Sequence, residues 1–456
     1  MGYDISDYES VYPPYGTVAD MEKLIQDCHS RGIRVLLDLV VNHTSDQHKW
    51  FKESRSSKDH PKRDWYIWRP AKYDEQGNRH PPNNWRGNFG GSVWEWDDAT
   101  QEYYLHLFCT EQPDLNWENA ETRAAIYESA MEFWLRKGVD GFRVDTVNMY
   151  SKDPEYRDAP VIDAGEKWQF AASLYCNGPR MHEYLAEMNT VLEKYGAMTV
   201  ADQKFDTTPR RWELPMLKHA IETTQDLIEG TDAWTTSFLE NHDQARSISR
   251  FGSDKTPEGR EKSGKMLSML VASLSGTLFV YQGQEIGMTN VPESWPIEEY
   301  KDVDSNNYYN FVKAKTNGDP AALARTKAAI QHLARDHART PIQWDGSKNG
   351  GFSTNKPWMR VNDNYPEVNV RREAQDKNSI LSFWKQMLRL RKEQSNTFVH
   401  GIFTVLDKEN NSTFVFEKKG TNGKAIVALN FTETDQPLAL PSDSTLKRLT
   451  GNYDDE

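Results

Sequence analysis

The sequence alternates amphipathic helical segments with short apolar strands, and this alternation limits the possible folds more than any other feature. In the first example, Thr17 can cap a helix whose apolar residues recur every three or four positions as far as Cys28. Gly32 can end that helix, and the apolar run 35–41 follows at once as a strand. The same order returns in residues 119–145. Helix, short connection and strand in succession predict an α/β fold with a parallel sheet.

Two other parts of the chain have a different pattern. Residues 43–116 are too many for an ordinary loop between a strand and a helix and have weak periodicity, so we expect an inserted domain there. The chain after Glu393 consists of short alternating runs, which predict a terminal antiparallel β domain. Recognisable parallel strands, each preceded by a helical segment, are predicted at 35–41, 141–145, 197–201, 234–239 and 277–281.

Composition excludes several classes of protein. The 68 acidic residues outnumber the 55 basic ones, and the net charge of −13 opposes binding to nucleic acid. Three cysteines without CxxC spacing indicate neither a zinc site nor a disulfide framework, which favours a reducing compartment and a cytoplasmic location. The longest uncharged run, 266–284, reads as helix, turn and strand, so we expect no membrane partner. The first residues do not resemble a signal peptide.

An arginine and an aspartate occupy the end of the second predicted strand. Arg143 and Asp145 are two positions apart, so they share one face, and Asp145 lies at the carboxyl end, where α/β barrels place their active sites. A neighbouring arginine lowers the pKa of a carboxyl group and keeps it ionised. An ionised, positioned aspartate is what a covalent glycosyl-enzyme mechanism requires. Taken alone, such a pair is more often structural than catalytic.

Polar clusters also stand at the ends of two other predicted strands. Asp38 lies within the first strand, Asn42 and His43 close it, and His242 and Asp243 follow a later one. Buried polar groups destabilise a fold unless they are paired. An Asn-His pair at each of two strand ends therefore indicates a shared cleft.

These segments closely resemble those of a known family. Asp38-Leu-Val-Val-Asn-His43, Gly141-Phe-Arg-Val-Asp145 and Glu240-Asn-His-Asp243 resemble signature segments of the α-amylase superfamily of retaining glycoside hydrolases, glycoside hydrolase family 13. Three further segments are similar to the oligo-1,6-glucosidase and maltase group: 2–8, 112–116 and 337–344. The resemblance implies a (β/α)8 TIM barrel at 1–42 and 117–393, an inserted domain at 43–116 and a C-terminal β domain at 394–456.

The resemblance also implies residue roles. Asp145 would be the nucleophile, and Asp243 would stabilise the oxocarbenium-like transition state. Arg143 would keep Asp145 ionised. The nonreducing-end glucose would be bound by Tyr3, Asp4, His43, His242 and Arg339. We expect no cofactor, no metal, a small α-glucoside substrate and a monomer.

Thr146, directly after the nucleophile, bears on the preferred linkage. In the resembling group, threonine there accompanies maltase preference for α-1,4 bonds, and valine accompanies isomaltase preference for α-1,6 bonds. The resemblance therefore implies maltose, sucrose and short malto-oligosaccharides as substrates. Two alternatives remain: a noncatalytic relative that binds sugar through the same residues, and a sucrose isomerase on the same scaffold.

The chain departs from the family pattern at the general acid. Retaining hydrolysis needs a second carboxyl group about 5 to 5.5 Å from the nucleophile, and the family supplies a glutamate after Thr-Val-Gly. This chain reads Thr199-Val-Ala-Asp202, so Asp202 is the aligned carboxylate, one methylene shorter. The strand and helix that normally follow are missing before Trp212, and the family places further elements before residue 2. We therefore expect an incomplete barrel with impaired general-acid catalysis.

Overall fold

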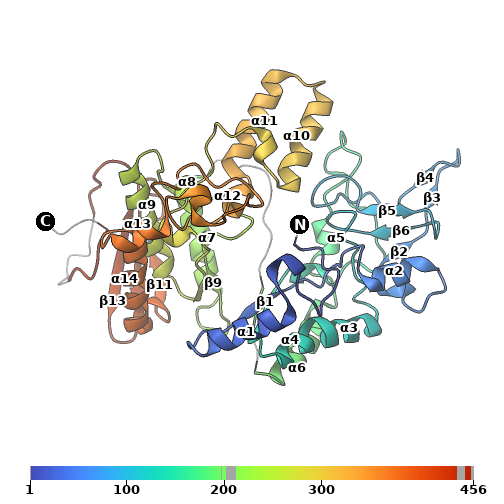
Figure 1. Cartoon of the computed structure of the whole chain (residues 1–456), viewed down its shortest axis with the longest axis horizontal. Helices are drawn as coiled ribbons and strands as arrows, with labels where there is room; N and C mark the ends of the chain where they lie inside the picture. Colours follow the sequence, from blue (N-terminus) through green and yellow to red (C-terminus); the bar gives the residue numbers. More distant parts are fainter. Residues whose placement is uncertain (1, 197, 202–211, 439–446, 453–456) are drawn as a thin grey trace. The chain divides into compact units, whose positions relative to one another are not determined.

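The computed structural model describes residues 2–196, 198–201, 212–438 and 447–452, and for 198–201 it describes the backbone alone. The chain divides into two compact units, Met1–Thr207 and Thr208–Glu456. Figure 1 draws the first in blue to green and the second in green to red. Each unit contains parallel strands of its own.

A three-stranded parallel sheet is the centre of the first unit, with the strand order β1-β7-β8. Its strands are β1 (Leu36–Leu39), β7 (Gly141–Val144) and β8 (Met198–Ala201). Asp38 on β1 pairs in register with Arg143 on β7. The first three predicted strands are thus confirmed, and their carboxyl ends share one edge of the sheet.

The helix predicted to begin after Thr17 is α1 (Val18–His29). It starts with a capping box, in which the Thr17 hydroxyl accepts from the backbone N of Asp20 and the Asp20 carboxylate accepts from the backbone N of Thr17. Ile25 is buried, whereas Leu24 is 51% exposed. The predicted helix is confirmed, and its apolar side chains differ in burial.

The second predicted helical segment is interrupted by a wider turn. It consists of α3 (Ala120–Ile126), the π-helical turn η3 (Tyr127–Glu132) and α4 (Phe133–Arg136). Ile126, Ala130 and Trp134 are buried, and Phe133 is partly buried. Together with α1 and α6 (Met181–Glu193), these helices lie around β1 (Figure 1).

Residues 43–116 contain short elements rather than one long loop. A small antiparallel sheet has the strand order β2-β6-β5, and β3 pairs with β4 as a hairpin. The elements are α2 (Lys49–Ser56), η2 (Arg63–Trp65), β2 (Trp68–Arg69), β3 (Lys72–Tyr73), β4 (Arg79–His80), β5 (Trp94–Asp97) and β6 (Glu102–Leu105). The unit also contains η1 (Pro13–Tyr15), η4 (Val147–Met149) and α5 (Ala172–Tyr175).

The second unit has a parallel pair, β9 (Thr236–Ser237) with β10 (Thr277–Leu278). These strands confirm the other two parallel strands expected from the sequence. Helix α9 (Pro257–Ala272) precedes β10, so the uncharged run 266–284 is indeed helix, turn and strand. In the part of the chain that is described, no helix is long and apolar enough to cross a membrane.

The predicted terminal β domain is an antiparallel sheet of three strands in the order β11-β12-β13. These strands are β11 (Ile402–Val405), β12 (Thr413–Lys419) and β13 (Lys424–Asn430). Helix α14 (Ile380–Glu393) lies beside them in Figure 1 and is capped by Ser379. One hydrophobic core includes residues of α9, α14 and all three strands.

Further helices complete the second unit. Figure 1 shows two of them, α10 and α11, packed as a hairpin. The remaining elements are α7 (Leu214–Asp226), α8 (Ser247–Phe251), η5 (Gln284–Ile286), η6 (Ile297–Glu299), α10 (Val303–Lys315), α11 (Pro320–Leu333), α12 (Asp336–Arg339), η7 (Lys348–Gly351), α13 (Val370–Gln375) and α15 (Ser395–Phe398).

Candidate active site

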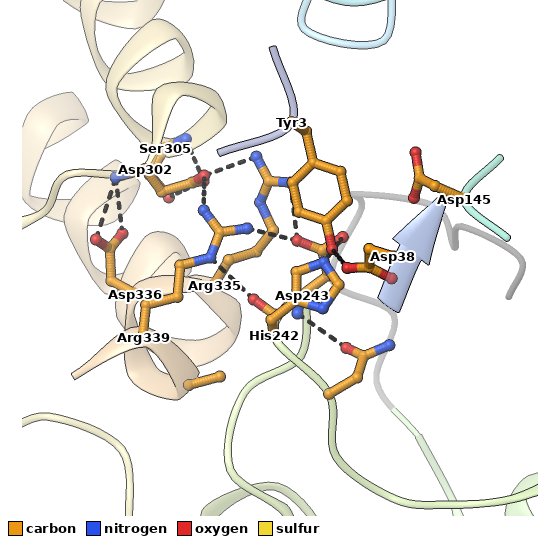
Figure 2. A network of polar contacts seen from close by, with 12 residues as sticks. Tyr3, Asp38, Asp145, His242, Asp243, Asp302, Ser305, Arg335, Asp336 and Arg339 are labelled. Carbon is orange, nitrogen blue, oxygen red and sulfur yellow. Dashed lines mark hydrogen bonds and ion pairs between the residues drawn. The ribbon is translucent and has the colours of Figure 1, made fainter. Parts of the chain in front are cut away.

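In the first unit, strand register brings together a group of side chains that we call the Asp145 cluster: Tyr3, Asp38, Arg143, Asp145 and Thr146. Nη1 of Arg143 donates to Oδ1 of Asp145 at 2.9 Å and to Oδ1 of Asp38 at 3.2 Å. The Tyr3 hydroxyl donates to Oδ2 of Asp38 at 2.7 Å (Figure 2). Burial and then Asp38 raise the pKa of Tyr3, so its phenol keeps the proton that it donates.

Asp145 is held on several sides. Its backbone N donates to the carbonyl of Leu39 at 3.0 Å, and its own carbonyl accepts from the Tyr150 hydroxyl at 3.0 Å. The hydroxyl of Thr146 donates to Oδ2 of Asp145 at 3.3 Å. Thr146 has φ 44° and ψ 36°, a left-handed conformation that is uncommon for a β-branched residue. This backbone strain lies directly after Asp145, a residue that is 8% exposed.

His43 is buried next to the amino-terminal segment. Its Nε2 lies 2.9 Å from the carbonyl of Tyr3, and Nδ2 of Asn42 donates to its Nδ1 at 3.3 Å. Nε2 of His43 also lies 3.0 Å from Nε2 of Gln112, which donates to the same carbonyl of Tyr3 at 3.1 Å. Burial lowers the pKa of His43, so the ring is neutral.

A buried lysine, Lys152, contacts Asn42, the residue that donates to His43. Lys152 lies 3.1 Å from Oδ2 of Asp114 and 3.2 Å from Oδ1 of Asn42. Oδ2 of Asp114 also accepts from Nδ2 of Asn42 at 3.1 Å. Lys152 was missed by the sequence reasoning, since an isolated lysine usually lies in solvent.

Two further predicted residues are Asp4 and Asp202. Asp4 accepts from the backbone N of Gly2 at 3.2 Å and directly follows Tyr3. Asp202, the expected general acid, lies outside the described residues, so its position remains a prediction.

In the second unit, four side chains form what we call the Asp243 cluster: Asp243, Asp302, Arg335 and Arg339. Oδ1 of Asp243 accepts from Nη1 of Arg335 at 3.1 Å and from Nη2 of Arg339 at 2.5 Å. Oδ1 of Asp302 lies 2.6 Å from Nη2 of Arg335 and 3.3 Å from Nη1 of Arg339 (Figure 2). Burial acts to lower the pKa of Arg335, but Asp302 and Asp243 outweigh it and raise that pKa.

Two members of the Asp243 cluster were not found from the sequence. Arg335 is four positions before Arg339, next to the short helix α12, and this i, i+4 spacing is a signal that could have found it. Asp302 is the N-cap of α10. In a sequence, an aspartate at this position indicates the start of a helix and gives no sign of a functional site.

The residues of the segment Glu240-Asn-His-Asp243 have two different tasks. The carbonyl of His242 accepts from Nε of Arg339 at 2.9 Å, and its Nε2 lies 3.5 Å from Oδ2 of Asp243. Glu240 is buried and accepts from Nη1 of Arg246 at 3.0 Å and from the backbone N of Ser247 at 2.8 Å. Glu240 therefore fixes the local backbone, whereas His242 belongs with the Asp243 cluster.

Each cluster has a clear chemical capacity. The Asp145 cluster presents a positioned carboxylate supported by a guanidinium, as nucleophilic catalysis requires. The Asp243 cluster presents a carboxylate and two cations that can bind sugar hydroxyls or respond to charge on a substrate. Among the described residues, no group of three or more His, Cys, Asp or Glu side chains could hold a metal ion.

Comparisons with known proteins show what the chain is similar to. The family model described as the α-amylase catalytic domain matches residues 1–212 and 197–401. The chain is 50% identical over 473 residues to an α-glucosidase of Candida albicans, which covers 95% of this chain and 83% of that protein. It is 45% identical over 499 residues to the oligo-1,6-glucosidase IMA3 of Saccharomyces cerevisiae, which covers 99% of this chain and 84% of that protein.

A solved structure is also similar. Isomaltulose synthase from Erwinia rhapontici NX5, in complex with its natural substrate sucrose, superposes with a TM-score of 0.87 at 34% identity, covering 95% of this chain and 80% of that one. The two stretches of the family match meet at 197–212, where the sequence departs from the family pattern. The family match and the similar solved structure confirm the expected fold class, a TIM barrel, and the C-terminal antiparallel sheet is present. The chain belongs to the α-amylase family, glycoside hydrolase family 13, and is an enzyme by that family.

Proposed function

We propose that the protein is a retaining α-glucosidase of the maltase type, which releases terminal α-1,4-linked glucose from maltose, sucrose and short malto-oligosaccharides. The observation that carries this proposal is the Arg143 contact to Asp145 at the carboxyl end of β7, at 2.9 Å. Relatives at 42–50% identity are named α-glucosidase or oligo-1,6-glucosidase. We place the enzyme in carbohydrate metabolism, in the cytoplasm and as a monomer.

In the proposed first step, a carboxylate oxygen of Asp145 bonds to the anomeric carbon while the glycosidic bond breaks. The departing oxygen takes a proton from a general acid, and positive charge develops on the sugar ring in the transition state. Asp243 stabilises that charge. In the second step the deprotonated general acid takes a proton from water, the water oxygen bonds to the anomeric carbon, and the bond to Asp145 breaks, so the configuration at that carbon is retained.

The substrate-binding residues are assigned by their polar groups. The guanidinium of Arg339 supplies hydrogen-bond donors and Asp4 supplies acceptors for sugar hydroxyls, and the neutral ring of His43 lies beside Tyr3. Tyr3 donates to Asp38, and His242 lies beside Asp243, so both are assigned to sugar binding next to these carboxylates. The domain limits proposed are 1–42 with 117–393 for the barrel, 43–116 for the inserted domain and 394–456 for the C-terminal domain.

Asp202 is the proposed general acid, although aspartate is shorter than glutamate. A misplacement of about 1 Å can reduce the rate about 100-fold. Leaving groups that are acidic phenols need little protonation, so their release depends mainly on the nucleophile. We therefore propose a catalytically impaired glucosidase, much faster on an activated aryl α-glucoside than on maltose.

The decisive experiment measures kcat on 4-nitrophenyl α-glucoside and on maltose for the wild type, Asp145→Asn and Asp202→Asn. The proposal expects Asp145→Asn to lose turnover of both substrates by more than about 10⁴-fold, and Asp202→Asn to lose maltose turnover selectively. Aryl glucoside turnover by Asp145→Asn within tenfold of the wild type would contradict the nucleophile. Equal losses on both substrates in Asp202→Asn would contradict the acid.

A second candidate function is isomerisation of sucrose, because a similar solved structure is an isomaltulose synthase. In that reaction the fructose set free in the first step attacks the glucosyl enzyme in place of water. Product analysis with sucrose distinguishes the two functions. Glucose and fructose in equal amounts support hydrolysis, and a disaccharide isomer of sucrose supports the isomerase.

A further inference from the structure

We propose that Asp302 is a positioning residue that neutralises Arg335 and Arg339, so that the site around Asp243 accepts a positively charged sugar ring. This inference rests on the proposed glucosidase function and deepens it. Asp302 is 3% exposed as a residue, and its carboxylate is joined by ion pairs to both arginines.

The contacts form a closed ring of four charges. Arg335 joins Oδ1 of Asp302 at 2.6 Å to Oδ1 of Asp243 at 3.1 Å through its two terminal nitrogens. Arg339 joins the same two oxygens at 3.3 Å and 2.5 Å. Each guanidinium is therefore held at both ends, and its plane is fixed by two carboxylates.

The two oxygens of Asp302 have separate tasks. Oδ1 faces the arginines, while Oδ2 accepts from the backbone N and the hydroxyl of Ser305 and caps α10. The backbone N of Asp302 donates to both oxygens of Asp336 at 3.1 and 3.2 Å, which fixes the residue further. An asparagine caps a helix about as well as an aspartate. Capping alone therefore does not require the negative charge that Oδ1 presents to the arginines.

Charge balance shows what Asp302 adds. The four ion-paired side chains carry two positive and two negative charges, so the sum over these four is zero. Asp304 also acts on Arg335, and Asp336, whose pKa is raised by burial, acts on Arg339. Without the carboxylate of Asp302, Asp243 would face two arginines and the sum would be +1. Charges at such distances interact strongly where water is partly excluded. A net positive cluster would disfavour an oxocarbenium-like transition state and leave a neutral sugar almost unaffected.

The test compares two probes of similar shape and different charge. Isothermal titration measures the dissociation constants of 1-deoxynojirimycin, a protonated iminosugar, and of glucose for the wild type and Asp302→Asn. The iminosugar should bind at least about tenfold more weakly to Asp302→Asn, and glucose should change by less than about threefold. Asp319 caps α11 through the backbone N of Ala322 at 2.8 Å, so Asp319→Asn is the matched control and should alter neither constant.

A second variant tests the opposite sign. Arg335→Gln makes the cluster net negative, so the iminosugar should gain affinity relative to glucose, and Asp302→Asn/Arg335→Gln should restore the wild-type ratio. If Asp302→Asn does not fold, the change in iminosugar affinity relative to glucose in Arg335→Gln tests the proposal: a gain supports it and a loss contradicts it. If Asp302→Asn weakens the binding of 1-deoxynojirimycin and of glucose by the same factor, the charge role is overturned and Asp302 has only a structural role. Failure of the wild type to bind either probe would overturn the proposed function itself.

Discussion

Nη1 of Arg143 lies 2.9 Å from Oδ1 of Asp145, the carboxylate two positions further along the same strand end. The same nitrogen is 3.2 Å from Asp38 on the neighbouring strand. One guanidinium group therefore lies between two carboxylates, which would repel each other without it. The orientation of Asp145 depends on a contact that comes directly from strand register.

Replacement of Arg143 tests this dependence. Arg143→Gln removes the positive charge and should lower kcat/KM on 4-nitrophenyl α-glucoside at least about 100-fold, because the nucleophile loses its partner. Arg143→Lys keeps the charge with a single nitrogen and should lose less. Steady-state kinetics at one pH suffice. A Gln variant as active as the Lys variant would show that charge is not what Arg143 contributes.

Thr146 is predicted to influence linkage preference. Thr146→Val keeps the branched shape and removes the hydroxyl that donates to Asp145. The ratio of kcat/KM for maltose to that for isomaltose should fall, by an amount equivalent to about 1 to 3 kcal/mol. Thr146→Ser retains the hydroxyl and serves as the control. An unchanged ratio in Thr146→Val would remove this residue from the specificity argument.

His48 should make the protein sensitive to acid. Burial lowers the pKa of His48 to about 4, and its Nδ1 accepts from the backbone N of Trp50. Below about pH 6.5 the unfolded chain binds a proton that the folded chain does not, so the free energy of unfolding falls as pH drops from 6.5 to 4, by up to about 3 kcal/mol.

His48→Asn keeps an N-cap acceptor and removes the titrating ring, so it should flatten that part of the pH dependence. Thermal unfolding at pH 7 and pH 4.5 gives the comparison. His60→Asn replaces a histidine that is only half-buried and is the control. The hypothesis fails if the Tm difference between the two pH values is the same in His48→Asn as in the wild type.

Lys418 should have an effect at alkaline pH. It is fully buried on β12 and donates to the hydroxyl of Ser275 and the carbonyl of Gly401, each at 2.6 Å. Burial, and then the charge of Arg391, lower the pKa of Lys418 to about 7. Between pH 7 and about 10 the unfolded chain holds a proton that the folded chain releases. The folded state should therefore gain stability as pH rises, about 1.4 kcal/mol per pH unit at most.

Lys418→Met removes this titration and keeps an unbranched side chain of similar length. The wild type should gain Tm relative to Lys418→Met between pH 7 and pH 9, whichever protein is more stable at pH 7. Equal changes of Tm in both proteins would mean that Lys418 does not titrate in this range.

The sequence predicted elements best where periodicity was regular. The strand around Asp38 and the helix capped by Thr17 follow from local patterns of apolar residues and caps, which do not depend on distant contacts. The exposure of Leu24 could not be predicted, because helical spacing marks an apolar face without stating what covers it. The π-helical turn in η3 likewise has no local sequence signal.

For the candidate site, the sequence predicted residues within motifs and missed those that support them. Arg143 and Asp145 were predicted together because strand geometry places positions i and i+2 on one face. Arg335 contacts Asp243 from 92 residues away, and Asp302 reaches the cluster through its ion pair with Arg335. Charged residues in a helical region usually lie in solvent. The spacing of Arg335 from Arg339 was the one local signal, and nothing local connects Asp302 with either arginine.

The shared core of α9, α14 and the C-terminal sheet limits how this protein can be shortened. Truncation before β11 would remove the apolar cover of two helices and leave Arg391 with its backbone partners in an exposed turn. Such a fragment would expose apolar side chains, and we expect it to bind chaperones and to be degraded by proteases. Expression trials that seek a minimal catalytic fragment should therefore retain all three strands.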